Sequence, residues 1–288
     1  MRIAVLSDQL SDDLEEAIQL GLLLEIDTYE LRWVRPPGAL RIRRVGELSE
    51  DEASVLGAIV RRHGVTVSAI SPGLFRSWWS SGLHPEGQLR LLDRCFRLAE
   101  ALGTRNIIIH GFLPPEGRRN GVCPPSVIAI LTQAAERAER SGMQLLLRNA
   151  PDCYSDTGAH TASIVHAVHL DALGVSWDPC HAARAGENAI GEGYDWVSPF
   201  VRDVCVRDQK QGEGLGFEDV VLAEGNMDWR AQLEALARDH YQGTITLGSQ
   251  VEPRLLSTMH SLEALRKLLR EVRNRRLTSP GEDGILKV

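Results

Sequence analysis

The sequence has few aromatic residues, no long apolar segment and no excess of positive charge. Aromatic residues make up 5% of the 288 positions, and the formal net charge is −7. An acidic chain has no general attraction to nucleic acid or to an acidic membrane surface. Apolar runs such as 107–109 and 145–147 are short, whereas a membrane helix needs about 20 residues. We therefore expect no nucleic-acid partner and no membrane partner.

Cysteine pairs with metal-binding spacing are also missing. The five cysteines are Cys95, Cys123, Cys153, Cys180 and Cys205. Their odd number and wide spacing argue against a disulfide framework or a structural zinc site, and favour a reducing compartment. The opening MRIAVLSD reaches Asp8 after a few apolar residues, which is too short for the apolar core of a signal peptide. A cytoplasmic location is expected.

Short β-rich runs alternate with segments of helical period along the whole chain. Strands are expected at 2–6, 28–31, 65–70, 106–110, 143–148, 174–178, 203–207 and 244–248. Each is followed by a helix or helix-like segment, and eight such units are the number in a (β/α)8 barrel. A doubly wound sheet usually has a glycine turn after its first strand, but here Leu6 is followed by Ser-Asp-Gln. We predict an α/β fold with one TIM-barrel domain over 1–276 and a tail over 277–288.

Polar residues lie where the predicted strands end. The candidates are Glu30, Arg32, His110, Arg148, Asp178, His181, Cys205, Arg207 and Asp208. In a barrel, catalytic groups come from the carboxyl ends of several strands. Carboxylates and imidazoles at these positions could bind a divalent ion, and a fixed arginine is another means of stabilising negative charge.

Three stretches carry a family resemblance. They are YELR at 29–32, GVSWDPCHAARAGE at 174–187 and LAEGNMDWRAQLEAL at 222–236. From about Arg2 to Leu269 the chain resembles the sugar phosphate isomerase/epimerase proteins of the xylose-isomerase-like barrel superfamily. The resemblance implies the barrel fold and an isomerase- or epimerase-like activity. Relatives in this superfamily are often dimers or tetramers, so a homodimer or homotetramer is also expected from the resemblance.

In that superfamily four strand-end residues usually hold one divalent metal: a glutamate, the aspartate of WDP, a histidine and a last glutamate. The matching positions here are Arg148, Asp178, Cys205 and Gly248. Only the aspartate is retained. The two glutamates that can serve relatives as an acid/base pair are both replaced. The resemblance therefore supports the fold and predicts that this chain works without the usual metal.

We expect an enzyme that transfers a proton on a small polar, anionic carbonyl or hydroxy compound, with no cofactor. Arg148 would replace the metal as electrophile, Asp178 would orient it, and His110 or His181 would carry the proton. A guanidinium cannot coordinate a metal, but it can pair with two oxygens of a carboxylate, phosphate or enolate. A divalent metal at Asp178 and His181 is the weaker alternative.

Substrate contacts are expected from a wider set of residues: Glu30, Arg32, Arg207, Asp208, Trp78, Trp79 and Cys205. Glu30 and Arg32 also fit a polar layer at the strand end, and Cys205 fits an inert core position. The two tryptophans lie in SPGLFRSWWSSGLHP, which is typical of a lid and also of a subunit contact.

Alternative interpretations stay open. Arg148 and Asp178 equally fit a buried salt bridge in an inactive site, and His110 equally fits a structural, hydrogen-bonded histidine. The whole chain could be a non-catalytic binding protein on a degenerate isomerase fold. It could also be a recruited metal-independent lyase, cyclase or hydrolase of a specialised biosynthetic pathway.

Overall fold

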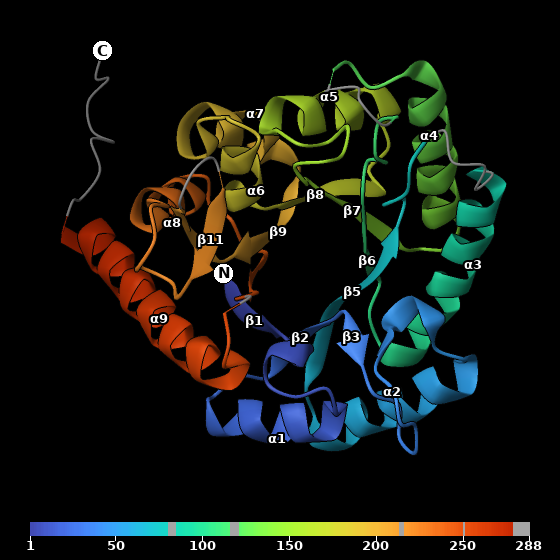
Figure 1. Ribbon diagram of the computed structural model, residues 1–288, viewed down its shortest axis with the longest axis horizontal. Coiled ribbons are helices and arrows are strands. Elements are labelled where there is room, and N and C mark those ends of the chain that lie inside the picture. The colour runs from blue at the N-terminus through green and yellow to red at the C-terminus, as the bar shows by residue number, and fades with distance from the viewer. Residues whose placement is uncertain (80–84, 116–120, 213–215, 250, 279–288) are drawn as a thin grey trace, which may run out of the picture.

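Eight parallel strands close into a barrel at the centre of the molecule (Figure 1). The computed structural model describes residues 1–79, 85–115, 121–212, 216–249 and 251–278. The barrel strands are β1 (Arg2–Leu6), β2 (Thr28–Leu31), β5 (Thr66–Leu74), β6 (Asn106–Ile109), β7 (Gln144–Arg148), β8 (Leu173–Trp177), β9 (Val201–Val206) and β12 (Thr244–Leu247). They hydrogen-bond in the order β1-β12-β9-β8-β7-β6-β5-β2. The predicted (β/α)8 TIM barrel is confirmed.

Helices surround this barrel (Figure 1). They are α1 (Leu14–Leu23), α2 (Glu50–His63), α3 (Pro85–Leu102), α4 (Pro125–Arg140), α5 (Gly158–Val168), α6 (Pro179–Arg184), α7 (Tyr194–Val197), α8 (Trp229–Arg238) and α9 (Arg254–Thr278). Local sequence sets their ends: Ser49 and Glu52 form a capping box at the start of α2, and Gly64 ends that helix at φ +67°. No helix in the described part of the chain is both long and apolar enough to span a membrane.

The last helix reaches into the predicted tail. Helix α9 begins at Arg254, directly after Pro253, and ends at Thr278. Two residues of the predicted tail over 277–288 are therefore helical, and the rest of that tail lies outside the described residues.

Two small hairpins were not expected from the sequence. One pairs β3 (Trp33–Val34) with β4 (Arg43–Arg44), and the other pairs β10 (Asp208–Gln211) with β11 (Phe217–Val220). They occupy the connections that follow β2 and β9, so both extend the carboxyl-terminal face of the barrel. The hairpins bring additional charged side chains to that face.

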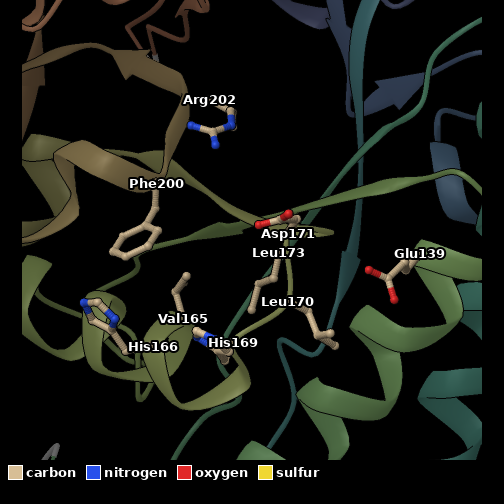
Figure 2. A pocket seen from close by; sticks show the side chains of 9 residues that line it. All are labelled: Glu139, Val165, His166, His169, Leu170, Asp171, Leu173, Phe200 and Arg202. Atoms are coloured by element: carbon tan, nitrogen blue, oxygen red, sulfur yellow. The ribbon is translucent and has the colours of Figure 1, made fainter.

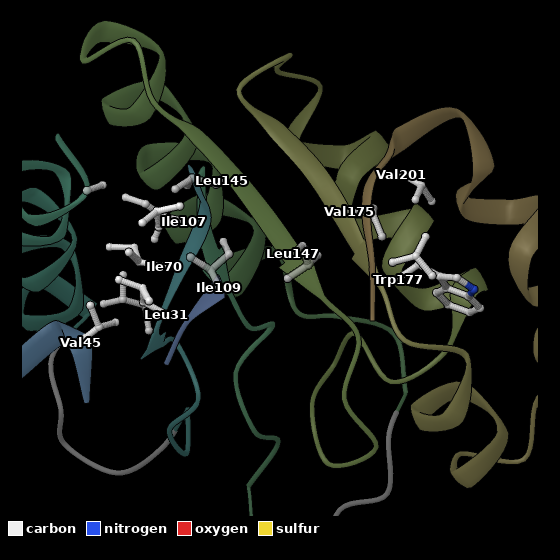
Figure 3. Close-up of a cluster of buried hydrophobic side chains, with 14 of the residues drawn as sticks. Leu31, Val45, Ile70, Ile107, Ile109, Leu145, Leu147, Val175, Trp177 and Val201 are labelled. Atoms are coloured by element: carbon white, nitrogen blue, oxygen red, sulfur yellow. The ribbon is translucent and has the colours of Figure 1, made fainter. Parts of the chain in front are cut away.

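Alternating residues of the strands separate two environments. Ile107, Ile109, Leu145 and Leu147 belong to the large hydrophobic cluster between barrel and helices (Figure 3). Inward-facing neighbours form only a small apolar cluster of Ala69, Ile108 and Leu146. This alternation follows from the two-residue period of a strand. Above the small cluster, the barrel interior is polar.

Leu147→Ala should destabilise the fold by about 2–5 kcal/mol, because the side chain is fully buried and the barrel cannot collapse around the cavity. Leu23→Ala is the control, since Leu23 is 81% exposed and should cost less than about 0.5 kcal/mol. Urea unfolding measures both. Equal losses would contradict the assignment of Leu147 to the core.

Candidate active site

A pocket of about 330 Å³ lies at the carboxyl ends of the barrel strands. We call it the mouth pocket. Six of its lining residues are arginines: Arg32, Arg44, Arg76, Arg148, Arg184 and Arg207. Two histidines, His110 and His181, and two aspartates, Asp178 and Asp219, line it as well. The pocket is therefore strongly cationic where a barrel enzyme carries its chemistry.

A second pocket, of about 470 Å³, is lined by residues of α4, α5, β8 and β9 and of the segments beside them (Figure 2). Its lining includes His169, which ends α5, Asp171, which precedes β8, and Arg202, near the start of β9. These residues lie at the amino-terminal side of the strands, which in this type of barrel serves stability. We therefore assign the chemistry to the mouth pocket.

Arg148 is the centre of a buried polar network inside the barrel. Its Nη1 and Nη2 donate to the two carboxylate oxygens of Glu30 at 3.0 and 2.8 Å. Nη2 also donates to Asp203 Oδ2 at 3.2 Å, and Nε donates to Ser176 Oγ at 2.9 Å. Strands β2, β7, β8 and β9 each contribute one of these residues. We call the four residues the barrel network.

The charge of Arg148 is already neutralised within this network. Burial raises the pKa of Glu30 and Arg148 opposes that rise, while both Glu30 oxygens accept N–H donors, as an ionised carboxylate does. Burial would lower the pKa of Arg148, but Glu30 and Asp203 outweigh it, so the guanidinium stays charged. One cation thus faces two carboxylates. Arg148 therefore stabilises the barrel interior through these pairs, whether or not a ligand is bound.

Asp178 pairs with Arg207 and not with Arg148. Its Oδ2 lies 3.0 Å from Arg207 Nε and 3.2 Å from His181 Nδ1. Its Oδ1 accepts from the backbone N–H of His181 at 3.0 Å and so caps α6. Burial would raise the pKa of Asp178, but Arg207 and His181 outweigh burial and bring it to about 2. The expectation that Asp178 is the partner that orients Arg148 is wrong.

Both histidines of the mouth pocket are neutral at pH 7. Burial lowers the pKa of His181 to about 4, although Asp178 opposes the shift. Its Nδ1 lies 2.8 Å from the carbonyl oxygen of Asn149, an acceptor that fixes the proton on Nδ1 and leaves a lone pair on Nε2. Burial, then the charges of Arg76 and Arg148, lower the pKa of His110 well below its usual value. Each imidazole can therefore accept a proton.

Four buried nitrogen atoms of residues that line this pocket have no hydrogen-bond partner in the described part of the chain. They are Arg32 Nε, Arg207 Nε, Arg207 Nη2 and His110 Nδ1. Leaving a buried polar group unsatisfied costs roughly 1–3 kcal/mol. The absence of a partner on His110 Nδ1 speaks against the interpretation of His110 as a hydrogen-bonded structural residue. Unmet groups of this kind in a pocket are suited to a ligand.

Cys205 and Asp208 differ in position. Cys205 lines the mouth pocket but is 6% exposed, and burial raises the pKa of its thiol, so it carries no thiolate. Asp208 is not among the residues that line the pocket. Its carboxylate accepts the backbone N–H groups of Ala223, Gly225 and Met227 at 3.0 to 3.2 Å. Asp208 thus organises the loop that follows β11.

The tryptophans do not line the mouth pocket either. Trp79 packs edge-on against Phe112 at 5.0 Å, and Trp78 is 45% exposed. The predicted lid continues into residues 80–84, which lie outside the described residues. Arg76, two residues before Trp78, does line the pocket.

Four charged residues of this pocket were not expected from the sequence. They are Arg44 of β4, Arg76 of the loop after β5, Arg184 of α6 and Asp219 of β11. The available signal was the density of arginine in RWVRPPGALRIRRV, at 32–45, directly after the second predicted strand. By contrast, Glu30 lies below the pocket in the barrel network, as a polar layer at the strand end requires.

A divalent metal does not fit the four positions at which the superfamily holds one. Arg148 is a cation, Asp178 is engaged by Arg207, Cys205 is a protonated thiol and Gly248 has no side chain. In the described part of the chain, no group of three or more His, Cys, Asp or Glu side chains could hold a metal ion. That the protein works without a metal stays a prediction.

Comparisons with known proteins agree with the fold. The model of the xylose isomerase-like TIM barrel family matches residues 16–268. No curated protein matches the sequence. A xylose isomerase domain protein from Planctomyces limnophilus is 18% identical, with a TM-score of 0.71 over 94% of this chain and 98% of that one.

Two epimerase structures have the same fold. An L-ribulose 3-epimerase is 16% identical, with a TM-score of 0.75 over 99% of each chain. A 3-keto-D-glucoside 4-epimerase from E. coli is 15% identical, with a TM-score of 0.69 over 92% of this chain and 98% of that one. At such identities the likeness concerns the fold alone.

Arg148→Met should destabilise the protein by about 3–5 kcal/mol, because Glu30 and Asp203 would remain buried without their cation. Adding Glu30→Met to this variant should restore part of the loss. Arg90→Met is the control, since Arg90 is 73% exposed. Urea unfolding gives the three free energies. A loss for Arg148→Met no larger than that for Arg90→Met would contradict the role of the barrel network.

The His181 imidazole should titrate near pH 4 in the folded protein, because burial disfavours its charged form. The unfolded chain binds the same proton near pH 6.5, so stability should fall as the pH drops from about 6.5 to 4 and this contribution should level off below that. NMR titration of the histidine side chains measures the midpoint, and His181→Asn assigns the signal. A midpoint near 6.5 would show that burial does not control this group.

Proposed function

The chain belongs to the xylose isomerase-like TIM barrel family, and on that basis we propose that it is an isomerase- or epimerase-like enzyme for a small anionic carbonyl or hydroxy compound. The observation that carries the proposal is a mouth pocket lined by six arginines that also holds two neutral imidazoles. The arginines supply attraction for an anion, and the imidazoles supply proton acceptors.

His181 is the first proton acceptor in this proposal. The carbonyl oxygen of Asn149 accepts a hydrogen bond from His181 Nδ1–H, so Nε2 carries the lone pair and is the basic nitrogen. When Nε2 removes the proton from the carbon beside a carbonyl, the electron pair of the C–H bond moves toward the carbonyl oxygen and an enolate forms. His110 comes from the end of β6, whereas His181 lies on α6, so a proton can be returned from a different element.

Arg207 is the better electrophile for that enolate. Its Nη2 and Nε are both buried without a hydrogen-bond partner in the described part of the chain, and the ion pair with Asp178, at 3.0 Å from Nε, holds the guanidinium in place. A donor that is fixed in advance stabilises developing negative charge without reorganisation. The role that the sequence suggested for Arg148 therefore passes to Arg207, and Arg148 acts through the barrel network. No step of this route needs a metal.

Unsatisfied groups support an active pocket over a degenerate one. Burying Arg207 Nη2 and His110 Nδ1 without partners reduces stability. A binding protein could also use Arg207, but a neutral histidine whose tautomer is fixed by a backbone carbonyl is suited to proton transfer. This arrangement is the reason for preferring the enzyme.

Hydrogen–deuterium exchange tests the proposal. The protein, treated with a chelator, is incubated in D₂O with a panel of phosphorylated and carboxylated ketoses, and NMR follows deuterium at the carbon beside the carbonyl. Exchange should occur with at least one compound. It should fall by about 10²–10⁴-fold in His181→Asn, the range for losing a general base.

Arg207→Lys provides the second arm of this experiment. It keeps a charge near Asp178 but removes the planar donor set, so exchange should drop while anion binding persists. A protein that binds anionic ketoses and exchanges none of them would retire the proton-transfer proposal in favour of a binding protein. His240→Asn, on a residue outside the mouth pocket, is the matched control.

A further inference from the structure

The charges around the mouth pocket are distributed unevenly. On one side, Arg184 pairs with Asp219, and Arg207 pairs with Asp178. On the other side lie Arg32, Arg44 and Arg76, which we call the arginine flank. On this flank Arg32 alone has a carboxylate within 4 Å in the described part of the chain, Asp8 at 2.7 Å.

Arg44 is held in place by groups that do not neutralise it. Its guanidinium carbon lies 4.4 Å from the centre of the Trp33 ring, the residue opposite it in the β3–β4 hairpin. Its Nη1 lies over Gly73, where an added Cβ would be 2.6 Å away. Gly73 also has φ +79°, which favours glycine. The guanidinium is thus preorganised by an aromatic face and by bare backbone.

Arg76 is presented by a loop that is fixed immediately before it. Phe75 has φ +58° and is fully buried, and its backbone N–H donates to Gln88 Oε1 at 2.9 Å. Its carbonyl accepts from Phe112 N–H at 2.8 Å. A non-glycine residue in this conformation stores strain that the surrounding packing must balance. The anchored Phe75 places the exposed Arg76 at the rim of the pocket.

These three cations lie close enough to repel one another. Burial, and then the charges of Arg76 and Arg32, lower the pKa of Arg44. Asp8 balances Arg32, so two positive charges of the flank are left without a carboxylate within 4 Å in the described part of the chain. Crowded cations of this kind become favourable when an anion binds between them.

We propose that the arginine flank is the subsite for a phosphate monoester dianion, with Arg44 and Arg76 as its specificity-determining residues and Arg32 as the third donor. Two unbalanced positive charges match the two negative charges of a phosphate monoester, whereas a carboxylate balances one of them. Arginine also offers planar paired donors that suit phosphate oxygens.

This inference rests on the proposed function in one respect, the direction in which the substrate lies in the pocket. The phosphoryl group binds at the arginine flank, and the carbonyl carbon lies on the opposite side of the pocket, beside Arg207 and His181. A substrate with its charge at one end and its reacting carbon at the other fits this division.

Binding of three probes tests the subsite without any turnover: glycerol 3-phosphate, glycerate and glycerol, measured by calorimetry on the full chain. Glycerol 3-phosphate should bind at least tenfold more tightly than glycerate, and glycerol should not bind. Arg44→Gln and Arg76→Gln should each weaken the phosphate probe by about 10- to 100-fold, the range for losing a hydrogen bond to a charged group.

Arg43→Gln is the matched control for Arg44→Gln. Arg43 precedes Arg44 in β4, but it pairs with Glu52 of α2 and does not line the pocket. It removes the same charge from the same hairpin and should leave binding unchanged. If Arg44→Gln and Arg43→Gln behave alike while both remain folded, or if glycerate binds as tightly as glycerol 3-phosphate, the inference is overturned.

The pH dependence gives an independent measurement. The phosphate monoester loses its second proton near pH 6, so its binding should tighten between about pH 5 and 7, while glycerate binding stays flat. Among the other groups that face the flank, His110 and His181 have lowered pKa values and stay neutral in this window. The acidic groups that face it are Asp8, beside Arg32, and Glu47, near Arg44. Equal pH profiles for the two probes would also contradict the inference.

Failure of the subsite and failure of the proposed function give different results. Arginine-dependent binding of glycerol 3-phosphate, with no exchange of any phosphorylated ketose in D₂O, supports the subsite and overturns the enzyme. Exchange that is the same in the wild-type protein and in Arg44→Gln supports the enzyme and overturns the subsite.

Discussion

The bidentate pairing of Arg148 with Glu30 holds the interior of the barrel together. Through Ser176 and Asp203 the same guanidinium also contacts β8 and β9, so one side chain links strands from both halves of the chain. Asp203 in turn accepts hydroxyl donors from Thr244 and Thr246 at 2.8 and 2.7 Å. Most barrels fill this level with branched apolar side chains. Here a polar layer forms the floor of the mouth pocket and determines what can lie above it.

A floor whose charges are already paired changes the chemistry that the scaffold can support. Where the superfamily holds a removable metal, this chain has a fixed cation whose charge is already used by the fold. The free donors lie one level higher, on Arg207, and at the rim, on Arg44 and Arg76. Two imidazoles remain neutral among these charges because burial disfavours their protonation. The pocket thus holds arginines that can bind an anion together with neutral imidazoles that can accept a proton.

The alternation of β-rich runs and helical segments was enough to predict the barrel, because each strand and helix is encoded by neighbouring residues. Ser49 with Glu52, and the glycine after His63, are examples of such local signals. The ion-pair partners could not be predicted in the same way. Glu30, Arg148 and Asp203 are far apart in sequence and meet only through the order of strands in the closed sheet. Asp178 was expected to orient Arg148 because both match metal-ligand positions of the resembled superfamily, but its carboxylate pairs with Arg207 instead. Hairpins with strands of two to four residues, such as β3–β4, show no periodicity that a sequence pattern could reveal.

The β3–β4 hairpin carries an arginine on each of its two faces. Arg43 and Arg44 are adjacent in a strand, so they lie on opposite faces, and one anchors α2 through Glu52 while the other lines the pocket. A shift of the pairing by one residue would exchange the two positions. Because both positions hold arginine, a shift of the register by a single residue would still leave one guanidinium facing the pocket and one facing α2, so insertions or deletions within 35–42 can accumulate during evolution without removing either cation.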